Sequence, residues 1–169
     1  MGRRKTPPAT DLDTFDLAIL EILQRDNLMP QRSIGEAVNL SAAAVQRRIK
    51  RMQESGVILA NVAVVDPARL GRAITVLVEI VVESERIDLI ESVRASLAAA
   101  PEVQQCYYVT GEADFVVVIT VATMGEYEAL TRRLFFKNHN VKRFRTLVVM
   151  DRVKVGLHVP LAIPGRDGA

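Results

Sequence analysis

Basic and amide side chains within residues 41–55 are the ones best placed for chemistry in this 169-residue chain. Arg47, Arg48, Lys50 and Arg51 fall within five positions, and Gln46 precedes them. Arginine can bind guanine and glutamine can bind adenine through paired hydrogen bonds, whereas Lys50 and Arg51 suit phosphate contacts. At about 100° per residue, the solvent side of a helix would carry Ala43, Gln46, Arg47, Lys50 and Arg51. Arg48 would lie at the flank, where it could pack its stem or pair with an acid. The candidate DNA contacts are Ser41, Ala43, Gln46, Arg47, Lys50 and Arg51.

The residues around this segment predict a helix-turn-helix. Ser41 is a good N-cap and Gly56 a good helix stop, and a short helix over 31–38 precedes the turn Asn39-Leu40-Ser41. An earlier helix is expected over 14–25, with Asp13 as its N-cap. A run of cations alone is more often just a solvated helix face. Here the turn and the caps agree with each other, which favours DNA binding.

The pattern changes from helical to strand-like after Gly56. Residues 57–65 (VILANVAVV) predict a strand, and Asp66-Pro67 marks a break. The elements expected beyond the break follow the order β-α-β-β-α-β, which is ferredoxin-like. The fold class is therefore α+β, with an N-terminal winged-type helix-turn-helix domain and a C-terminal ferredoxin-like βαββαβ domain. The expected parts are a flexible arm (1–10), the helix-turn-helix domain (11–56), a linker strand and hinge (57–71), a ligand-binding and oligomerisation domain (72–155) and a tail (156–169).

The predicted hairpin carries a small polar cluster, Tyr107, Thr110, Gly111 and Asp114. A hydroxyl and a carboxylate beside a glycine turn could bind the ammonium group of a small ligand. An ordinary hairpin, with glycine for the turn and aspartate for a local bond, explains the same spacing and is favoured on spacing alone. The neighbouring Cys106 is expected to be a small buried hydrophobic residue.

Composition sets further expectations. One cysteine leaves no internal disulfide, and two histidines leave little for a metal site. The sequence lacks a phosphate-binding glycine loop and any catalytic constellation, so we expect neither an enzyme nor a cofactor. The apolar runs are too short for a membrane span and nothing resembles a signal peptide, which favours the cytoplasm. The net charge of +2 hides a local concentration of cations over 47–51.

Over about residues 11–155 the chain resembles the Lrp/AsnC family of feast/famine transcription regulators. The resemblance rests on several motifs in the family's order: LDTFDLAILEILQRD, NLSAAAVQRRIKRMQESGVI, VVDPARLG, CYYVTGEADFVVVI and VKRFRTLVVM. It implies a regulator of double-stranded DNA whose dimers form through their sheets and assemble into octamers or other assemblies of dimers. It also implies an amino acid, or a related metabolite, as effector.

The resemblance assigns residues to the effector pocket and also shows departures from the family pattern. The implied effector-binding residues are Tyr107, Thr110, Gly111, Asp114, Asn140 and Thr146. Asn140 stands where the family usually has glycine, and Ala42 to Ala44 replace its usual serine and proline mixture. These departures keep a second hypothesis open, an architectural DNA-wrapping protein without an effector. A third, a decarboxylase of the haem pathway resembling the same family, is less favoured because a basic recognition helix would serve no purpose.

Overall fold

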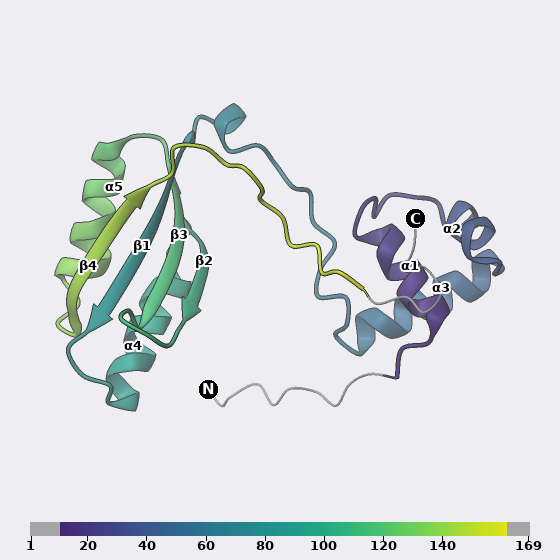
Figure 1. Cartoon of the computed structure of the whole chain (residues 1–169), viewed down its shortest axis with the longest axis horizontal. Helices are drawn as coiled ribbons and strands as arrows, with labels where there is room; N and C mark the ends of the chain where they lie inside the picture. The colour runs from purple at the N-terminus through teal and green to yellow at the C-terminus, as the bar shows by residue number, and fades with distance from the viewer. Residues whose placement is uncertain (1–10, 162–169) are drawn as a thin grey trace. The chain divides into compact units, whose positions relative to one another are not determined.

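The computed structural model describes residues 11–161, and the chain divides into two compact units (Figure 1). The described part of the first unit comprises residues 11–63 and 155–161, and the second unit comprises Val64–Lys154. The chain therefore leaves the first unit, builds the second and returns to the first. The expected arm, residues 1–10, and the tail from residue 162 onward lie outside the described residues.

The first unit contains α1 (Thr14–Leu23), α2 (Gln31–Val38) and α3 (Ala42–Glu54). Asp13 caps α1 as predicted, and its side chain accepts a hydrogen bond from the Asp16 backbone N–H at 2.9 Å. Ser41 caps α3 in the same way, through the Ala44 N–H at 3.2 Å. Apolar side chains from all three helices form one core: Ile19, Leu20, Ile34, Val38, Val45 and Met52. Local capping thus sets the helix starts, and this core holds the helices together.

The turn between α2 and α3 requires two special backbone positions. Asn39 adopts the left-handed conformation, with φ of 56°. A Cβ on Gly35 would lie 2.4 Å from the carbonyl oxygen of Leu40, far inside contact distance. The glycine at position 35 therefore permits the close approach of the turn backbone.

The second unit is a four-stranded antiparallel sheet in the order β2-β3-β1-β4. Its elements in chain order are a 3₁₀ turn (Ala68–Leu70), β1 (Ile74–Val82), α4 (Ile87–Ala98), β2 (Val103–Tyr108), β3 (Phe115–Val121), α5 (Met124–Thr131), a π-helical turn (Arg132–Phe136) and β4 (Val141–Val148). This is the predicted βαββαβ order. The predicted hairpin is present, since β2 pairs with β3.

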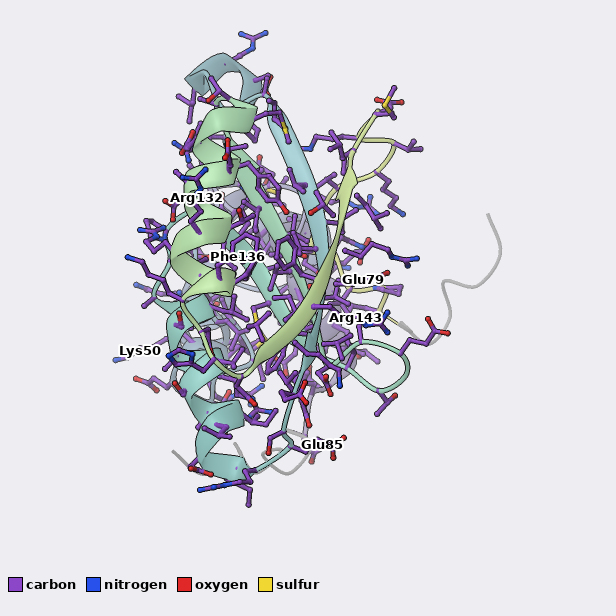
Figure 2. The ribbon with its side chains drawn as sticks, turned by 90° about the vertical axis from the view of Figure 1, so that its left-hand side faces the viewer. Lys50, Glu79, Glu85, Arg132, Phe136 and Arg143 are labelled. Carbon is purple, nitrogen blue, oxygen red and sulfur yellow. The ribbon has the colours of Figure 1, made fainter. Side chains whose placement is uncertain are left out.

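Both helices of this unit cover one face of the sheet (Figures 1 and 2). Alternate residues of β1 and β3, such as Val78 and Val117, are fully buried against α4 and α5. On the opposite face Leu77 lies between its register partners Val118 and Leu147. Figure 2 shows Glu79 and Arg143 on this uncovered side of the sheet. The unit therefore has one packed face and one open face with apolar residues in it.

Two local predictions were wrong. Residues 57–65 form no strand with any described residue, because no neighbouring strand is available to pair with this segment. Cys106 is exposed, although it lies in β2 as predicted. It belongs to the strand at the edge of the sheet, where alternation alone does not guarantee cover. Partial desolvation of the thiol still raises the pKa of Cys106, and this effect outweighs the opposing charge of Arg94.

Candidate DNA-binding surface and ligand-binding unit

The solvent face of α3 presents most of the predicted DNA contacts. Ala43, Gln46, Arg47 and Lys50 are all exposed, while Val45 and Met52 on the other side are fully buried. Lys50 has only a loose ion pair, 3.8 Å from Glu54. Arg47 forms no ion pair with any described residue. A guanidinium, an amide and an ammonium group thus project from successive turns of one helix, as a major-groove helix requires.

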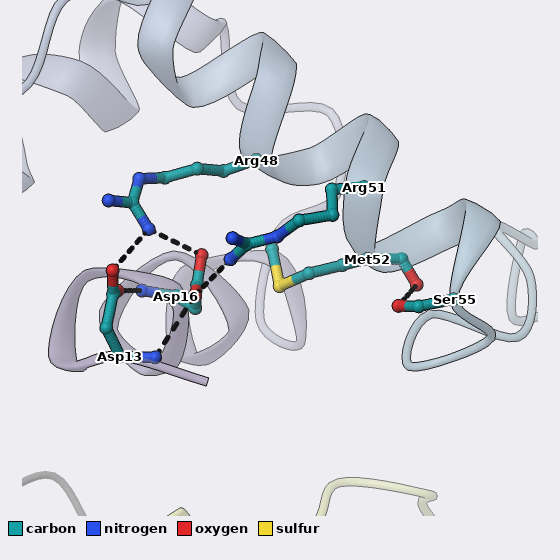
Figure 3. A network of polar contacts seen from close by, with 6 residues as sticks. All are labelled: Asp13, Asp16, Arg48, Arg51, Met52 and Ser55. Atoms are coloured by element: carbon teal, nitrogen blue, oxygen red, sulfur yellow. Dashed lines mark hydrogen bonds and ion pairs between the residues drawn. The ribbon is translucent and has the colours of Figure 1, made fainter. Parts of the chain in front are cut away.

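Arg48 and Arg51 also make contacts within the unit, because both bind acids of α1 (Figure 3). Arg48 Nη1 donates to Asp13 Oδ2 at 2.7 Å and to Asp16 Oδ1 at 2.9 Å, and Arg51 Nη2 donates to Asp16 Oδ2. The Asp16 side chain is completely buried. It also accepts from the backbone N–H of Asp13 at 3.1 Å. The buried carboxylate therefore fixes α3 to the start of α1.

The charges in this network stabilise one another. Burial raises the pKa of Asp13, but hydrogen bonds from the Asp16 N–H and from Arg48 outweigh it, so the pKa of Asp13 is below its ordinary value. The hydrogen bonds to Asp13 and Asp16 in turn raise the pKa of Arg48. The Arg48 guanidinium also lies over the Phe15 ring, 5.5 Å from its centroid. Arg48 is thus held within the unit, as one sequence-based interpretation expected.

Arg51 was predicted to contact phosphate, and its side chain remains half exposed in the structure. Its guanidinium nevertheless donates to Asp16, 35 residues earlier in the chain. Asp16 was not identified from the sequence as a partner of these cations. The signal that could have found it is its position at N3 of α1, where a carboxylate can reach back to the helix start.

The hairpin residues are spread over different contacts. The Tyr107 hydroxyl donates to Gln105 Oε1 at 2.9 Å. Asp114 Oδ2 accepts the backbone N–H of Val82 at 2.8 Å, at the end of β1. Gly111 has φ of 124°, which favours glycine there. Thr110 is exposed beside it. The turn is therefore well ordered by local bonds, and its carboxylate is partly used by the backbone.

Asn140 meets the same end of β1 from the other side. Its Oδ1 accepts the Ser84 N–H and its Nδ2 donates to the Ser84 carbonyl, each at 3.0 Å. Thr146 lies elsewhere, with its hydroxyl 2.6 Å from the Tyr127 hydroxyl on the helix-covered side. The structure thus brings Asp114 and Asn140 to one end of β1 and places Thr146 apart from them. Their role in binding an effector stays a prediction.

A hollow of about 330 Å³ adjoins Asn140, between α4 and the π-helical turn. Its polar lining includes Ser92, Arg133 and His139. A second hollow, of about 360 Å³, lies in the first unit beside Gln46 and Lys50 of α3. Among residues 11–161, no helix is long and apolar enough to cross a membrane. In the same range, no group of three or more His, Cys, Asp or Glu side chains could hold a metal ion.

A helix-turn-helix unit followed by a βαββαβ unit defines a two-domain DNA-binding regulator. Residues 12–58 match the model of a winged helix-turn-helix DNA-binding domain, and residues 75–158 match the Lrp/AsnC ligand binding domain. The chain belongs to the Lrp/AsnC family of transcription regulators.

Individual relatives agree with this assignment. The chain is 43% identical over 155 residues to an uncharacterized helix-turn-helix transcriptional regulator of Sinorhizobium fredii, covering 92% of each. It is 31% identical to the leucine-responsive regulatory protein of Salmonella typhimurium over 150 residues, covering 89% of this chain and 92% of the relative. The fold is similar to the crystal structure of an AsnC family regulator from Agrobacterium tumefaciens, with a TM-score of 0.83. The two sequences are 29% identical, and the match covers 88% of this chain and 97% of that one. The fold is also similar to that of a Neisseria meningitidis regulator solved as an L-Met complex (TM-score 0.82, 23% identity, covering 88% and 96%).

Proposed function

We propose that this regulator reads DNA through the exposed face of α3 and changes its assembly and DNA affinity when its second unit binds an amino acid. The observation that carries the DNA part is the division of the α3 cations. Arg48 and Arg51 bind the acids of α1, whereas Gln46, Arg47 and Lys50 are exposed and form no ion pair or hydrogen bond with α1. The exposed set has the chemistry for base edges and phosphates.

The open face of the sheet supports a homo-oligomer whose dimer contact is made by two copies of this face. Leu77, Val118 and Leu147 form an apolar band across three strands. Beside it Arg145 Nε donates to Glu79 Oε2 at 2.8 Å, and Tyr107 lies at the edge strand. A copy of the same face would cover the band. The assembly of such dimers, as an octamer or otherwise, is part of the proposal.

The amino-acid effector is supported by the ligand-binding domain that residues 75–158 match. It is also supported by the neighbouring fold solved with L-methionine. Asp114 could accept an ammonium group, and Thr110 adds a hydroxyl near the turn. An effector that fits a pocket shared by two subunits would shift the equilibrium between assembly states, because its affinity for those states differs.

A second candidate is an architectural DNA-wrapping protein without an effector. The observation favouring it is the Asn140 side chain, since both its polar atoms are already bound to Ser84. An occupied amide offers little to a ligand.

One experiment separates the two candidates. The full chain is incubated with each of the twenty amino acids, and the thermal midpoint and the assembly mass are measured, the latter by light scattering. The regulator predicts a midpoint shift together with a change in mass for at least one amino acid. A protein indifferent to all twenty, while still binding DNA, is the architectural protein.

A further inference from the structure

The chain segment after β4 shows an unusual pattern. From Val153 to Val159 every second residue is apolar (Val153, Val155, Leu157, Val159), and all four are exposed. In an extended chain this spacing puts the apolar side chains on one edge. Yet 150–161 forms no strand with any described residue. This segment therefore has the alternation of a strand without the pairing that usually holds one.

The Gln24 side chain binds the backbone of Val159 in this segment, as a neighbouring strand would do. Gln24 Nε2 donates to the carbonyl of Val159 at 3.1 Å, and Gln24 Oε1 accepts the Val159 N–H at 2.7 Å. The amide thus binds both backbone groups of one residue, 135 positions along the chain. Among residues 150–161, Val159 forms the only hydrogen bonds to other described residues.

Two further contacts lie on either side of this clamp. Leu161 packs against the apolar core of the first unit. His158 Nε2 lies 3.6 Å from Glu21 Oε2 on α1. Glu21 and Gln24 are three residues apart, so both project from the same side of α1. A contact set this small corresponds to a segment of low local stability.

We propose that residues 155–161 are a strap whose binding site is the outer face of α1, with Gln24 as the residue that holds it. Residues 149–154 join the end of β4 to the strap, so the chain passes between the two units a second time there. The few contacts make the docking of the strap reversible. It is a property of this chain's own contacts and holds whether or not an effector exists.

Hydrogen exchange of the full chain tests the clamp directly. The Val159 amide, bound to Gln24, is expected to exchange about three- to tenfold more slowly than the Leu157 amide, which has no described partner. Gln24→Ala should abolish this difference in exchange rate. Gln24→Glu keeps an acceptor for the Val159 N–H and should retain part of the difference. Gln104→Ala, at an exposed glutamine of β2, is the matched control and leaves it unchanged. Equal exchange of Val159 and Leu157 in the unaltered protein would overturn the proposal.

A double-mutant cycle tests the pairing by a second route. Val159→Pro removes the same N–H without altering α1. Gln24→Ala and Val159→Pro should each lower the unfolding midpoint of the first unit by roughly 2–4 °C. The double variant should lose no more than the larger single loss, because both changes break one contact. Additive losses would show that Gln24 acts independently of the strap and would contradict the proposal.

Discussion

Arg48 Nη1 lies 2.9 Å from Asp16 Oδ1, and this ion pair joins the recognition helix to the start of α1. Arg51 binds the other oxygen of the same carboxylate. Two of the four clustered cations thus neutralise a buried charge within the unit. Arg47 and Lys50 are the two cations of this cluster that form no ion pair with α1.

Asp16→Asn should destabilise the first unit strongly. The change replaces the carboxylate that Arg48 and Arg51 share with a neutral amide, which accepts through one oxygen only. Losing these charge-assisted hydrogen bonds should cost about 1–3 kcal/mol. The free energy of unfolding is measured by urea titration followed by circular dichroism. Asp11→Asn, at an exposed acid just before α1, is the control and should change it by less than about 0.5 kcal/mol. Equal values for the two variants would contradict the assigned role of Asp16.

Asp13→Asn should make the free energy of unfolding depend less on pH in the acid range. The folded-state pKa of Asp13 lies below its ordinary value, so its ionised form stabilises the fold above that ordinary value. This contribution is lost as the pH falls through the lower, folded-state pKa. Asparagine still caps a helix, so only the charge pairing with Arg48 is removed. Because Asp13 is about half exposed, the difference at pH 7 should be below about 1 kcal/mol.

The check on this prediction is thermal unfolding of both proteins between pH 2 and pH 7. The difference between them should shrink toward zero at the acid end. A difference that stays constant across this range would show that the Asp13 charge contributes nothing.

Gly35→Ala should disrupt the turn between α2 and α3. The new Cβ would meet the Leu40 carbonyl at 2.4 Å, and this backbone oxygen cannot move without shifting the start of α3. We expect a loss of about 1–3 kcal/mol in the free energy of unfolding, together with weaker DNA binding. Gly125→Ala in α5 is the matched control, since its Cβ would meet only Thr123 Oγ1 at an ordinary 3.7 Å. A neutral Gly35→Ala would show that the turn is not closely packed.

Arg47→Ala and Lys50→Ala should weaken DNA binding differently. Arg47 can bond to base edges, so its loss should cost about 1–3 kcal/mol on the target site and less on unrelated DNA. Lys50 suits a phosphate, so its loss should weaken binding to both about equally. Affinities for target and unrelated duplexes are measured by fluorescence anisotropy. Equal losses on both duplexes from both variants would contradict this division of roles.

Features that depend on neighbouring residues could be predicted from the sequence. The caps Asp13 and Ser41 and the turn at Gly56 act within one helical turn, and all three are found in the structure. The strand and helix order of the second unit also follows from local periodicity. Since hydrophobic spacing is a local signal, these elements needed no knowledge of the fold.

Features that depend on distant residues could not be predicted in this way. The partner of Arg51 lies 35 positions away, and that of Gln24 lies 135 positions away. Cys106 is exposed because β2 is an edge strand, and only the sheet order reveals that. The sequence therefore predicted which cations belong to α3, but not which of them form ion pairs with α1.

The salt dependence of DNA affinity tests the central claim most directly. The full chain and Lys50→Ala are titrated with the same duplex by fluorescence anisotropy at salt concentrations from about 50 to 200 mM. A recognition helix that binds phosphates predicts a steep linear fall of log K with log salt, and a slope smaller by about one for Lys50→Ala. An affinity that does not change with salt, or an identical slope for the two proteins, would contradict the assignment of α3 as the DNA-binding surface.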